Sequence, residues 1–311
     1  MLTAEGALQL HASKYAVRLA FAQEIFVAVI EREGLTFHSR FFPPVLDEAQ
    51  TASIICLAEG SWSADAPAVT LEAPSCFVFR EDAAPLLASS RRAEGEPYRA
   101  IEIHVPRDRL VLPLSDDVLS ISASEALRPY VSAVFAATNA MLPDATLALL
   151  DQLVSHGVVH QDVASQARHV DERFRELWEA FRPVVEAMYL SPTVKELSGS
   201  ISMTPRDFDR ELRAFIETIP AIGPSWRSLM RRWRVKLALL LLSAKGASVE
   251  DVARAAGYGS STAMGRAFRD VGMLAPSEIQ LHTQAAPAPM DVRSLSKSAD
   301  MVSDSAARQR V

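Results

Sequence analysis

The sequence predicts an α+β fold, in which a β-rich N-terminal half is followed by helices and then by an all-α C-terminal part. Three observations predict this fold. Short β-rich runs separated by turn residues occupy residues 52–105. After Ser124, apolar residues instead recur at intervals of three or four residues, the spacing of an amphipathic helix. An approximate duplication of capped helices lies within residues 193–269. Short strands at such spacing are typical of a small sandwich or barrel.

The strand-like runs of the N-terminal half alternate in polarity. In residues 98–105, apolar side chains mostly alternate with Arg99, Glu102 and His104, as a strand with one buried face requires, and Pro106 ends the run. The expected strands are Ser53 to Leu57, Val69 to Leu71, Cys76 to Phe79, and Ala100 to Val105.

Amphipathic helices follow the strands. One stripe of apolar residues at helical spacing runs from Leu127 to Thr138, and a second runs from Leu147 to Val154. The part of the first stripe from Leu127 to Val134 belongs either to the core or to a dimer seam, and the sequence leaves both open. A third helix is expected over Val170 to Met188, with a kink at Pro183.

Charge is distributed unevenly along the chain. The whole chain has 32 Lys and Arg against 38 Asp and Glu, a formal net charge of −6, which by itself argues against a nucleic-acid partner. Residues 1–183 contain 15 basic and 25 acidic residues, whereas residues 184–283 contain 13 basic and 10 acidic residues. A stretch of ten residues without an acid contains Arg227, Arg231, Arg232, Arg234 and Lys236. The pattern predicts a basic functional surface within an acidic chain.

The C-terminal segment repeats one pattern twice, a short capped helix, a turn and a second capped helix. In the first copy, Thr193 and Glu196 make a capping-box pattern, Thr204 caps the second helix, and Pro205 occupies its first turn. Ser200 is expected in the turn. Two helices joined in this way form a helix-turn-helix arrangement.

In the second copy, Ser248 and Asp251 take the capping-box positions, and Ser260 caps the second helix. Gly257 lies where a tight turn commonly needs a positive φ. Gly265 weakens the second helix by about 1 kcal/mol relative to Ala. Core positions recur in both copies, namely Val194, Leu197, Ile201, Phe208 and Leu212 in the first and Val249, Val252, Ala253, Tyr258, Met264 and Phe268 in the second.

A basic helix is expected to join the two copies. Ser225 to Leu242 is a run of 18 residues, which at about 1.5 Å per residue gives a rod of ~27 Å. Such a rod holds the two second helices about one turn of B-DNA apart, roughly 34 Å, so both enter successive major grooves on one face. Arginine reads guanine, threonine touches the thymine methyl group, and basic residues on the rod neutralise phosphates. The pattern therefore predicts DNA binding.

Residues 185–281 resemble the C-terminal DNA-binding domain of the AraC/XylS family of bacterial transcription regulators. The resemblance rests on the arginine-rich helix ending in residues 237–242, the run from Ser248 to Arg269, Gly272, and residues 275–278. It implies a sequence-specific transcription regulator, not an enzyme, that a small-molecule effector controls. The residues expected at the DNA are Thr204, Arg206, Asp209, Arg210, Arg213, Arg231, Arg232, Ser260, Ser261, Thr262, Ala263, Arg266 and Arg269.

The N-terminal half resembles the cupin-like regulatory domain of such regulators, in which a barrel is followed by dimerising helices. The matching segments are residues 71–80 and 102–110. Cupin enzymes cluster His and Glu metal ligands on adjacent strands, whereas these strands offer only His104, so neither a metal nor another cofactor is expected. By analogy, the expected lining of an apolar effector site is Ile54, Leu57, Phe77, Phe79, Ile101 and Ile103.

The expected organisation is a regulatory and dimerisation domain over residues 1–165, a linker helix over 166–184, a DNA-binding domain over 185–283, and a disordered tail over 284–311. The expected partners are double-stranded promoter DNA, a small-molecule effector, RNA polymerase and a second copy of the chain. Neither a signal peptide nor an apolar run of the roughly 18 to 20 residues that span a bilayer is evident, so a cytoplasmic location without membrane contact is expected.

Two alternatives remain open at this point. One is an enzyme, either a cupin-type catalyst or an alkyl-transfer repair protein, fused to a DNA-binding module. Alkyl acceptance needs a cysteine activated by a metal or a basic neighbour, whereas Cys56 and Cys76 lie in apolar runs and are interpreted as buried strand residues. The other alternative is an architectural protein that covers DNA without sequence preference and ignores metabolites.

Overall fold

The computed structural model of the chain describes residues 1–22, 24–38, 51–65, 68–80, 88–90, 97–112, 118–187, 189–190, 192–217 and 226–284. The strands are β1 (Leu2–Leu10), β2 (Ser13–Ala22), β3 (Ile25–Glu33), β4 (Phe37–His38), β5 (Thr51–Glu59), β6 (Ser61–Asp65), β7 (Ala68–Glu72), β8 (Ser75–Arg80), β9 (Ala88–Ser90), β10 (Tyr98–Pro106) and β11 (Val118–Ser120). The helices are α1 (Ser124–Ala136), α2 (Leu142–Ser155), α3 (Asp162–Arg168), α4 (Glu172–Glu186), α5 (Val194–Ser200), α6 (Pro205–Glu217), α7 (Trp226–Leu241), α8 (Val249–Ala255), α9 (Ser261–Asp270) and α10 (Pro276–Gln284). No helix in these ranges combines the length and the apolar composition that a membrane span requires.

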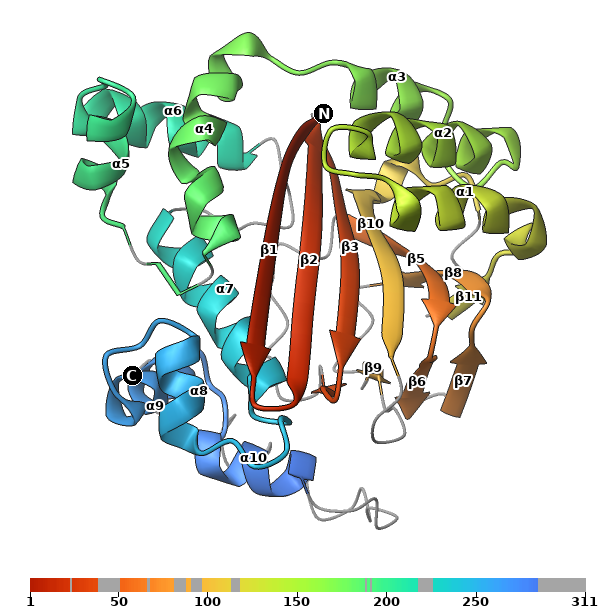
Figure 1. Cartoon of the computed structure of the whole chain (residues 1–311). Coiled ribbons are helices and arrows are strands. Elements are labelled where there is room, and N and C mark those ends of the chain that lie inside the picture. The colour runs from red at the N-terminus through yellow and green to blue at the C-terminus, as the bar shows by residue number, and fades with distance from the viewer. Residues whose placement is uncertain are drawn as a thin grey trace, which may run out of the picture.

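The N-terminal part contains two antiparallel sheets. The larger has seven strands in the order β1-β2-β3-β10-β5-β8-β11, and the smaller has four in the order β4-β9-β6-β7. The four strands expected from sequence lie within β5, β7, β8 and β10. The long strands β1, β2 and β3 were not expected, although they make one side of the larger sheet (Figure 1).

Alternate residues of the larger sheet face different cores, because successive side chains of a strand point to opposite faces. On β5, Ile54 and Cys56 pack into a core that also contains residues of α1, α2 and α3. Ile55 and Leu57 pack on the other face with Trp62. Figure 1 shows α1, α2 and α3 grouped together against the sheet.

The apolar stripe of α1 belongs to the core of the chain. Leu127 and Val134 are fully buried and Val131 is nearly so, all in the core between the sheet and α1–α3. The guanidinium of Arg18, itself buried, donates hydrogen bonds to the carbonyl oxygens of Ala137 and Phe135. Those carbonyls lie at the C-terminal end of α1, where helical donors run out, so β2 caps α1.

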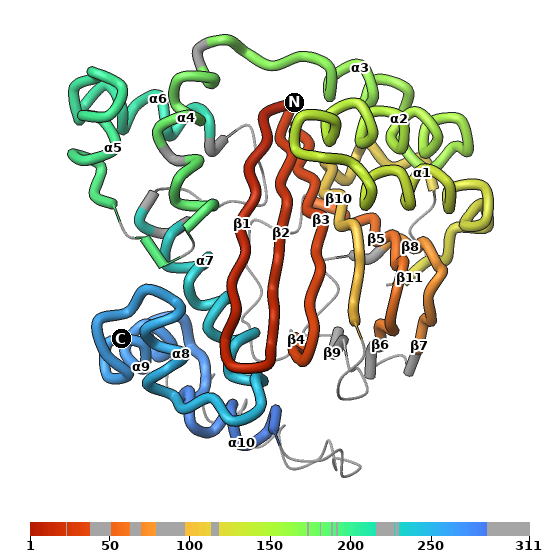
Figure 2. The backbone as a smooth tube through the Cα atoms, viewed as in Figure 1, coloured from red at the N-terminus to blue at the C-terminus, as the bar shows by residue number. Residues whose placement is uncertain are grey.

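A third core joins the sheet to the C-terminal helices. Phe21 of β2 meets Trp178 of α4 edge to face, with ring centroids 4.5 Å apart, and Trp178 Nε1 donates to the Thr3 carbonyl over 3.0 Å. Farther along, the Thr36 amide donates to Ser243 Oγ over 2.8 Å, just beyond the end of α7. Figure 2 shows α4 beside β1 and α8 near the turn that joins β1 to β2. The two parts of the chain therefore share one continuous apolar core.

The helices of the C-terminal part largely confirm the sequence-based expectations. The helix expected over residues 170–188 is α4, with Pro183 inside it. The basic helix expected over Ser225 to Leu242 is confirmed as α7, although its 16 residues span about 24 Å, less than the ~27 Å expected. The expected tail begins one residue too early, since Gln284 ends α10. The rest of the expected tail lies outside the described residues.

Candidate nucleic-acid interface

The second helix pair consists of α8 and α9, and α8 is capped at both ends. Ser248 Oγ accepts from the Asp251 amide over 3.1 Å, and Asp251 Oδ2 accepts from the Ser248 amide over 3.0 Å, so the expected capping box is present. At the other end, the Tyr258 amide donates to the Ala253 carbonyl over 2.8 Å, and Gly257 has a φ of +77°. Such a left-handed residue ends the helix and turns the chain toward α9.

Two hydrogen bonds fix the first turn of α9, the second helix of this pair. Ser260 Oγ accepts from the Ala263 amide over 3.1 Å, as expected of an N-cap, and the Ser261 amide donates to Glu250 Oε2 of α8 over 3.1 Å. Met264 and Phe268 are fully buried beneath the helix. The opposite face exposes Thr262, Arg266 and Arg269, while Ser261 and Ala263 are half-buried at its edge.

Gly265→Ala is expected to stabilise the protein by about 1 kcal/mol, the difference in helix propensity between the two residues. The added Cβ would meet no atom closer than Pro276 Cδ, at 4.0 Å, so the gain is not offset by a clash. Urea unfolding of both proteins measures the change. Gly199→Ala in the last turn of α5, where a Cβ also meets nothing within 4 Å, is the matched control with a smaller expected gain. A loss of stability for Gly265→Ala would contradict the helix geometry.

The first helix pair, α5 with α6, is built in the same way. Thr193 and Glu196 form the expected capping box, and Thr204 Oγ1 accepts from the Asp207 amide over 3.1 Å at the start of α6. The expectation for the turn was wrong. Ser200 is the last residue of α5, and Ser202 is the residue with a left-handed φ, +54°.

Two of the three exposed arginines of α6, Arg210 and Arg213, form ion pairs with acidic residues of the same helix. Arg206, Arg210 and Arg213 are exposed, whereas Phe208 and Leu212 are buried. The three ion pairs on this face are Arg210 Nη1 with Asp207 Oδ1 at 2.8 Å, Arg210 Nε with Glu211 Oε1 at 3.2 Å, and Arg213 Nη2 with Asp209 Oδ2 at 2.7 Å. Asp209 therefore lies at the expected surface as the partner of an arginine.

The basic helix α7 does not present all of its arginines in the same way. Arg227 and Arg231 are exposed, and Arg232 is half-buried. Arg234, which the sequence placed with them near the DNA backbone, instead donates from Nη2 to the Leu190 carbonyl over 3.3 Å and lies 5.8 Å from the centroid of the Tyr258 ring. Burial lowers the pKa of Arg234 and raises that of Tyr258 to about 12. Arg234 thus holds the α4–α5 connection against the second helix pair.

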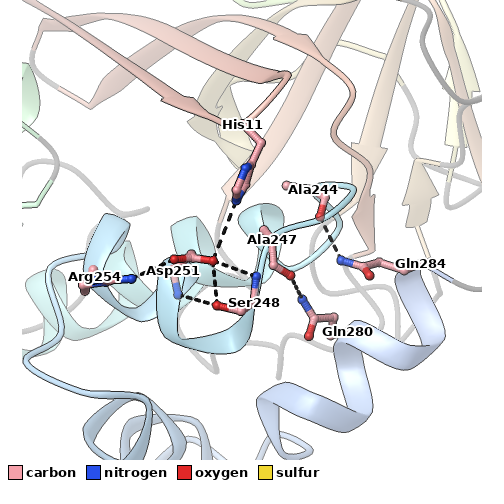
Figure 3. A network of polar contacts seen from close by, with 8 residues as sticks. All are labelled: His11, Ala244, Ala247, Ser248, Asp251, Arg254, Gln280 and Gln284. Carbon is pink, nitrogen blue, oxygen red and sulfur yellow. Dashed lines mark hydrogen bonds and ion pairs between the residues drawn. The ribbon is translucent and has the colours of Figure 1, made fainter.

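A polar network joins the β1–β2 hairpin to the second helix pair (Figure 3). His11, which occupies the hairpin turn with a φ of +53°, places Nε2 3.7 Å from Asp251 Oδ2. Arg254 Nη2 donates to the other carboxylate oxygen of Asp251 over 2.8 Å. Asp251 therefore serves at once as the capping residue of α8 and as the contact between α8 and the sheet. No local pattern in the sequence indicates this long-range contact.

Two glutamines of α10 close the end of α7 (Figure 3). Gln280 Nε2 donates to the Ala247 carbonyl over 2.7 Å, and Gln284 Nε2 donates to the Ala244 carbonyl over 2.8 Å and the Leu242 carbonyl over 3.2 Å. Carbonyls at and beyond a helix end lack helical donors. α10 therefore fixes the connection between α7 and α8, a role that the sequence did not reveal.

The capping carboxylate of Asp251 is expected to make stability depend on pH below about 4. Its hydrogen bonds with Ser248, aided by Arg254, lower its pKa from 3.8 to about 2. A lowered folded-state pKa stabilises the fold above pH 3.8, and this contribution is lost as pH falls through 2. Asp251→Asn should therefore be less stable than the native chain at pH 7, and the gap should narrow toward pH 2. Urea unfolding across this range measures the gap, and a constant gap would contradict the assignment.

The residues expected to line an effector site do not share one cavity. Ile54, Ile101 and Ile103 are fully buried in the core with α1–α3, whereas Leu57 and Phe77 are buried in the core on the other face of the sheet. The side chain of Phe79 lies outside the described residues. An open hollow of about 480 Å³ lies elsewhere, over β1, β2 and β3, with a lining that includes Lys14, Tyr15, Glu31 and Arg32.

In the comparison with known proteins, one family model covers the second helix pair and most of the first. Residues 197–281 match a model described as a helix-turn-helix domain. The search of curated proteins gave no match. Among solved structures, a Chromobacterium violaceum transcriptional regulator with an AraC-type DNA-binding domain is 18% identical over 37% of this chain and 96% of that chain, with a TM-score of 0.28. A DNA-binding transcriptional dual regulator from Escherichia coli K-12 is 20% identical over 36% of this chain and 98% of that chain, with a TM-score of 0.28.

ToxT from Vibrio cholerae strain SCE256, solved with an unsaturated fatty acid bound, is 11% identical over 92% of this chain and 97% of that chain, with a TM-score of 0.32. The family match begins at Leu197 in α5 and ends within α10, so it takes in α6, α7, α8 and α9 as well. Residues 197–281 are therefore a helix-turn-helix domain of the AraC type.

Proposed function

We propose that the protein is a sequence-specific, DNA-binding regulator of transcription in which α9 enters the major groove and reads bases. The exposed face of α9 is the observation that carries this proposal. It presents Thr262, Arg266 and Arg269 on a helix whose start is fixed by Ser260 and Glu250. Within the part of the chain that the structure describes, neither arginine has an ion pair, so both guanidinium groups are available to guanine or phosphate.

α6 is the second reading helix in this proposal, and it contributes less affinity. Its arginines Arg210 and Arg213 already form ion pairs with Asp207, Glu211 and Asp209. Contact with DNA requires these pairs to break or to rearrange, and the uncovered carboxylates repel phosphate. Arg206 has no such ion pair among the described residues, and it is the base-reading candidate of α6.

Selection of binding sites from random double-stranded DNA by the purified full-length chain tests the function. A regulator of this kind should enrich a defined motif, and its affinity for that motif should fall as salt rises because phosphate contacts release counterions. Protection of DNA without any enriched motif would identify an architectural protein instead. No binding at low salt would contradict the proposal altogether.

We further propose that a small molecule controls DNA binding by binding to the β-rich part, which we interpret as a cupin-like domain. The pairing of two chains also controls DNA binding in this proposal, and no enzymatic step is involved. The support is the shared core and the contact between His11 and Asp251, which couple the sheet to α8. RNA polymerase is the proposed partner at the promoter. Light scattering of the chain on its selected DNA site tests the pairing, and one chain on each intact site would contradict it.

A further inference from the structure

The two cysteines of the chain face each other across neighbouring strands. Cys56 of β5 is the register partner of Cys76 of β8, and neither forms a disulfide in this structure. Both side chains belong to the core between the sheet and α1–α3, so the two thiols lie on the same face of the sheet. Cys56 is fully buried, and Cys76 retains 4% of its surface exposed.

The backbone hydrogen bonds of Cys76 identify the kind of strand pair. The Ile121 amide donates to the Cys76 carbonyl over 2.8 Å, and the Cys76 amide donates to Ser124 Oγ over 3.0 Å. Both polar groups of Cys76 thus point away from β5, which makes Cys56 and Cys76 a non-hydrogen-bonded pair of the antiparallel ladder. In such pairs the Cα atoms are about 4.5 Å apart and the side chains are closer than in hydrogen-bonded pairs. A disulfide needs Cα atoms roughly 4.4 to 6.8 Å apart.

We propose that Cys56 and Cys76 form a reversible disulfide within the chain when it meets a small hydroperoxide. The two thiols already occupy a position from which the bond can close without a change of register. The bond would tie β5 to β8 at the point where Ser124 anchors the start of α1. The proposal does not depend on DNA binding, so either can fail without the other.

The chemistry begins at Cys76, the cysteine residue that retains 4% of its surface exposed. Its thiolate attacks one oxygen of the hydroperoxide, the O–O bond breaks, and the product is a sulfenic acid with an alcohol or water as leaving group. The Cys56 sulfur then attacks the Cys76 sulfur, the S–O bond breaks, and water leaves with the Cys56 proton. One hydroperoxide is reduced by two electrons while two thiols become one disulfide, and a small dithiol reverses the reaction by exchange.

The protonation of the pair supports this order of events. A hydrogen bond between the two sulfurs lowers the pKa of Cys76; burial opposes this effect, and a hydrogen bond with Ser124 adds to it. The same hydrogen bond raises the pKa of Cys56, together with its burial. Cys76 is therefore the better nucleophile toward the peroxide, because the thiolate is the reactive form.

Mass spectrometry of the full-length chain tests the proposal. Folded protein is treated with hydrogen peroxide, denatured, alkylated with N-ethylmaleimide and mapped by peptides. The expected result is a linked pair of peptides containing Cys56 and Cys76, the loss of both alkylation sites together, and recovery of both after treatment with dithiothreitol. Two alkylated cysteines after the peroxide step, or oxidation of Cys76 beyond the sulfenic acid without a linked peptide, would overturn the proposal.

Single variants supply the matched controls. In Cys56→Ala, peroxide should leave Cys76 as a sulfenic acid or a more oxidised form, and in Cys76→Ala the buried Cys56 should remain a free thiol. The melting temperature of the native chain should rise on oxidation and return on reduction, whereas neither variant should show this rise. If a variant does not fold, the linked peptide of the native chain still decides the matter.

Discussion

Gly257→Ala should lower the free energy of unfolding by more than about 2 kcal/mol, the range of severe backbone and clash effects. Gly257 has a φ of +77°, which a residue with a Cβ adopts at a cost. In addition, a Cβ at this position would overlap the Tyr189 carbonyl oxygen and would lie 3.0 Å from the Tyr189 carbonyl carbon. Because these are backbone atoms, relief requires the α4–α5 connection or the turn itself to move.

The free-energy cost of the clash can be separated from the free-energy cost of the left-handed backbone conformation. Gly246 has nearly the same φ, +78°, and a Cβ there would meet nothing within 4 Å. Gly246→Ala should therefore cost only about 1 kcal/mol, the penalty of the left-handed conformation. Urea unfolding of both variants measures the difference. Equal losses in the two variants would show that the Tyr189 backbone yields freely and that the turn is not clamped.

The sequence predicted the helix pairs well because their signals are local. Capping boxes such as Ser248 with Asp251 act within one helical turn, and the buried positions follow from helical period. The prediction for the turn of the first pair was wrong because it too relied on local signals alone. Ser202 corresponds to Gly257, since the Met203 amide bonds to the Ser198 carbonyl over 3.0 Å, but serine carries no signal for a positive φ, and local spacing alone suggested the wrong residue.

Contacts between distant segments could not be predicted in this way. Arg18 is a charged residue in an apolar run, and only the folded chain shows that it caps α1 from β2. Ile54 and Leu57 are both apolar strand residues, so the sequence suggested that they line the same effector site. They are three positions apart on β5, however, and residues an odd number of positions apart on a strand point to opposite faces of the sheet. Pairing of β1 with β2 likewise depends on a hairpin turn at His11, a residue type without a strong turn preference.

Arg266→Ala should weaken binding to the selected DNA site by about 1 to 3 kcal/mol, roughly 5- to 150-fold, while leaving the fold intact. The side chain is exposed on α9 and is not needed for packing, which Met264 and Phe268 provide. An arginine that contacts guanine through two parallel hydrogen bonds loses both bonds when it is replaced by alanine. The loss should be large on the selected site and small on a site in which the contacted base pair is changed. Titrations with both DNA duplexes measure this ratio.

Two other arginines distinguish base reading from simple charge. Arg227→Ala, at an exposed position of α7, should weaken binding to both duplexes equally, because a phosphate contact carries no sequence information. It should also reduce the salt slope, the slope of log affinity against log salt concentration, by about 1, because one phosphate contact is lost. Arg128→Ala, on the exposed side of α1 and paired with Glu125 at 3.8 Å, should change neither. If Arg266→Ala behaves like Arg227→Ala, with the ratio between duplexes unchanged, then α9 contacts the backbone and the bases are read elsewhere. The salt slope therefore decides whether α9 binds DNA, and the ratio of the affinities for the two duplexes decides separately whether α9 reads the base sequence.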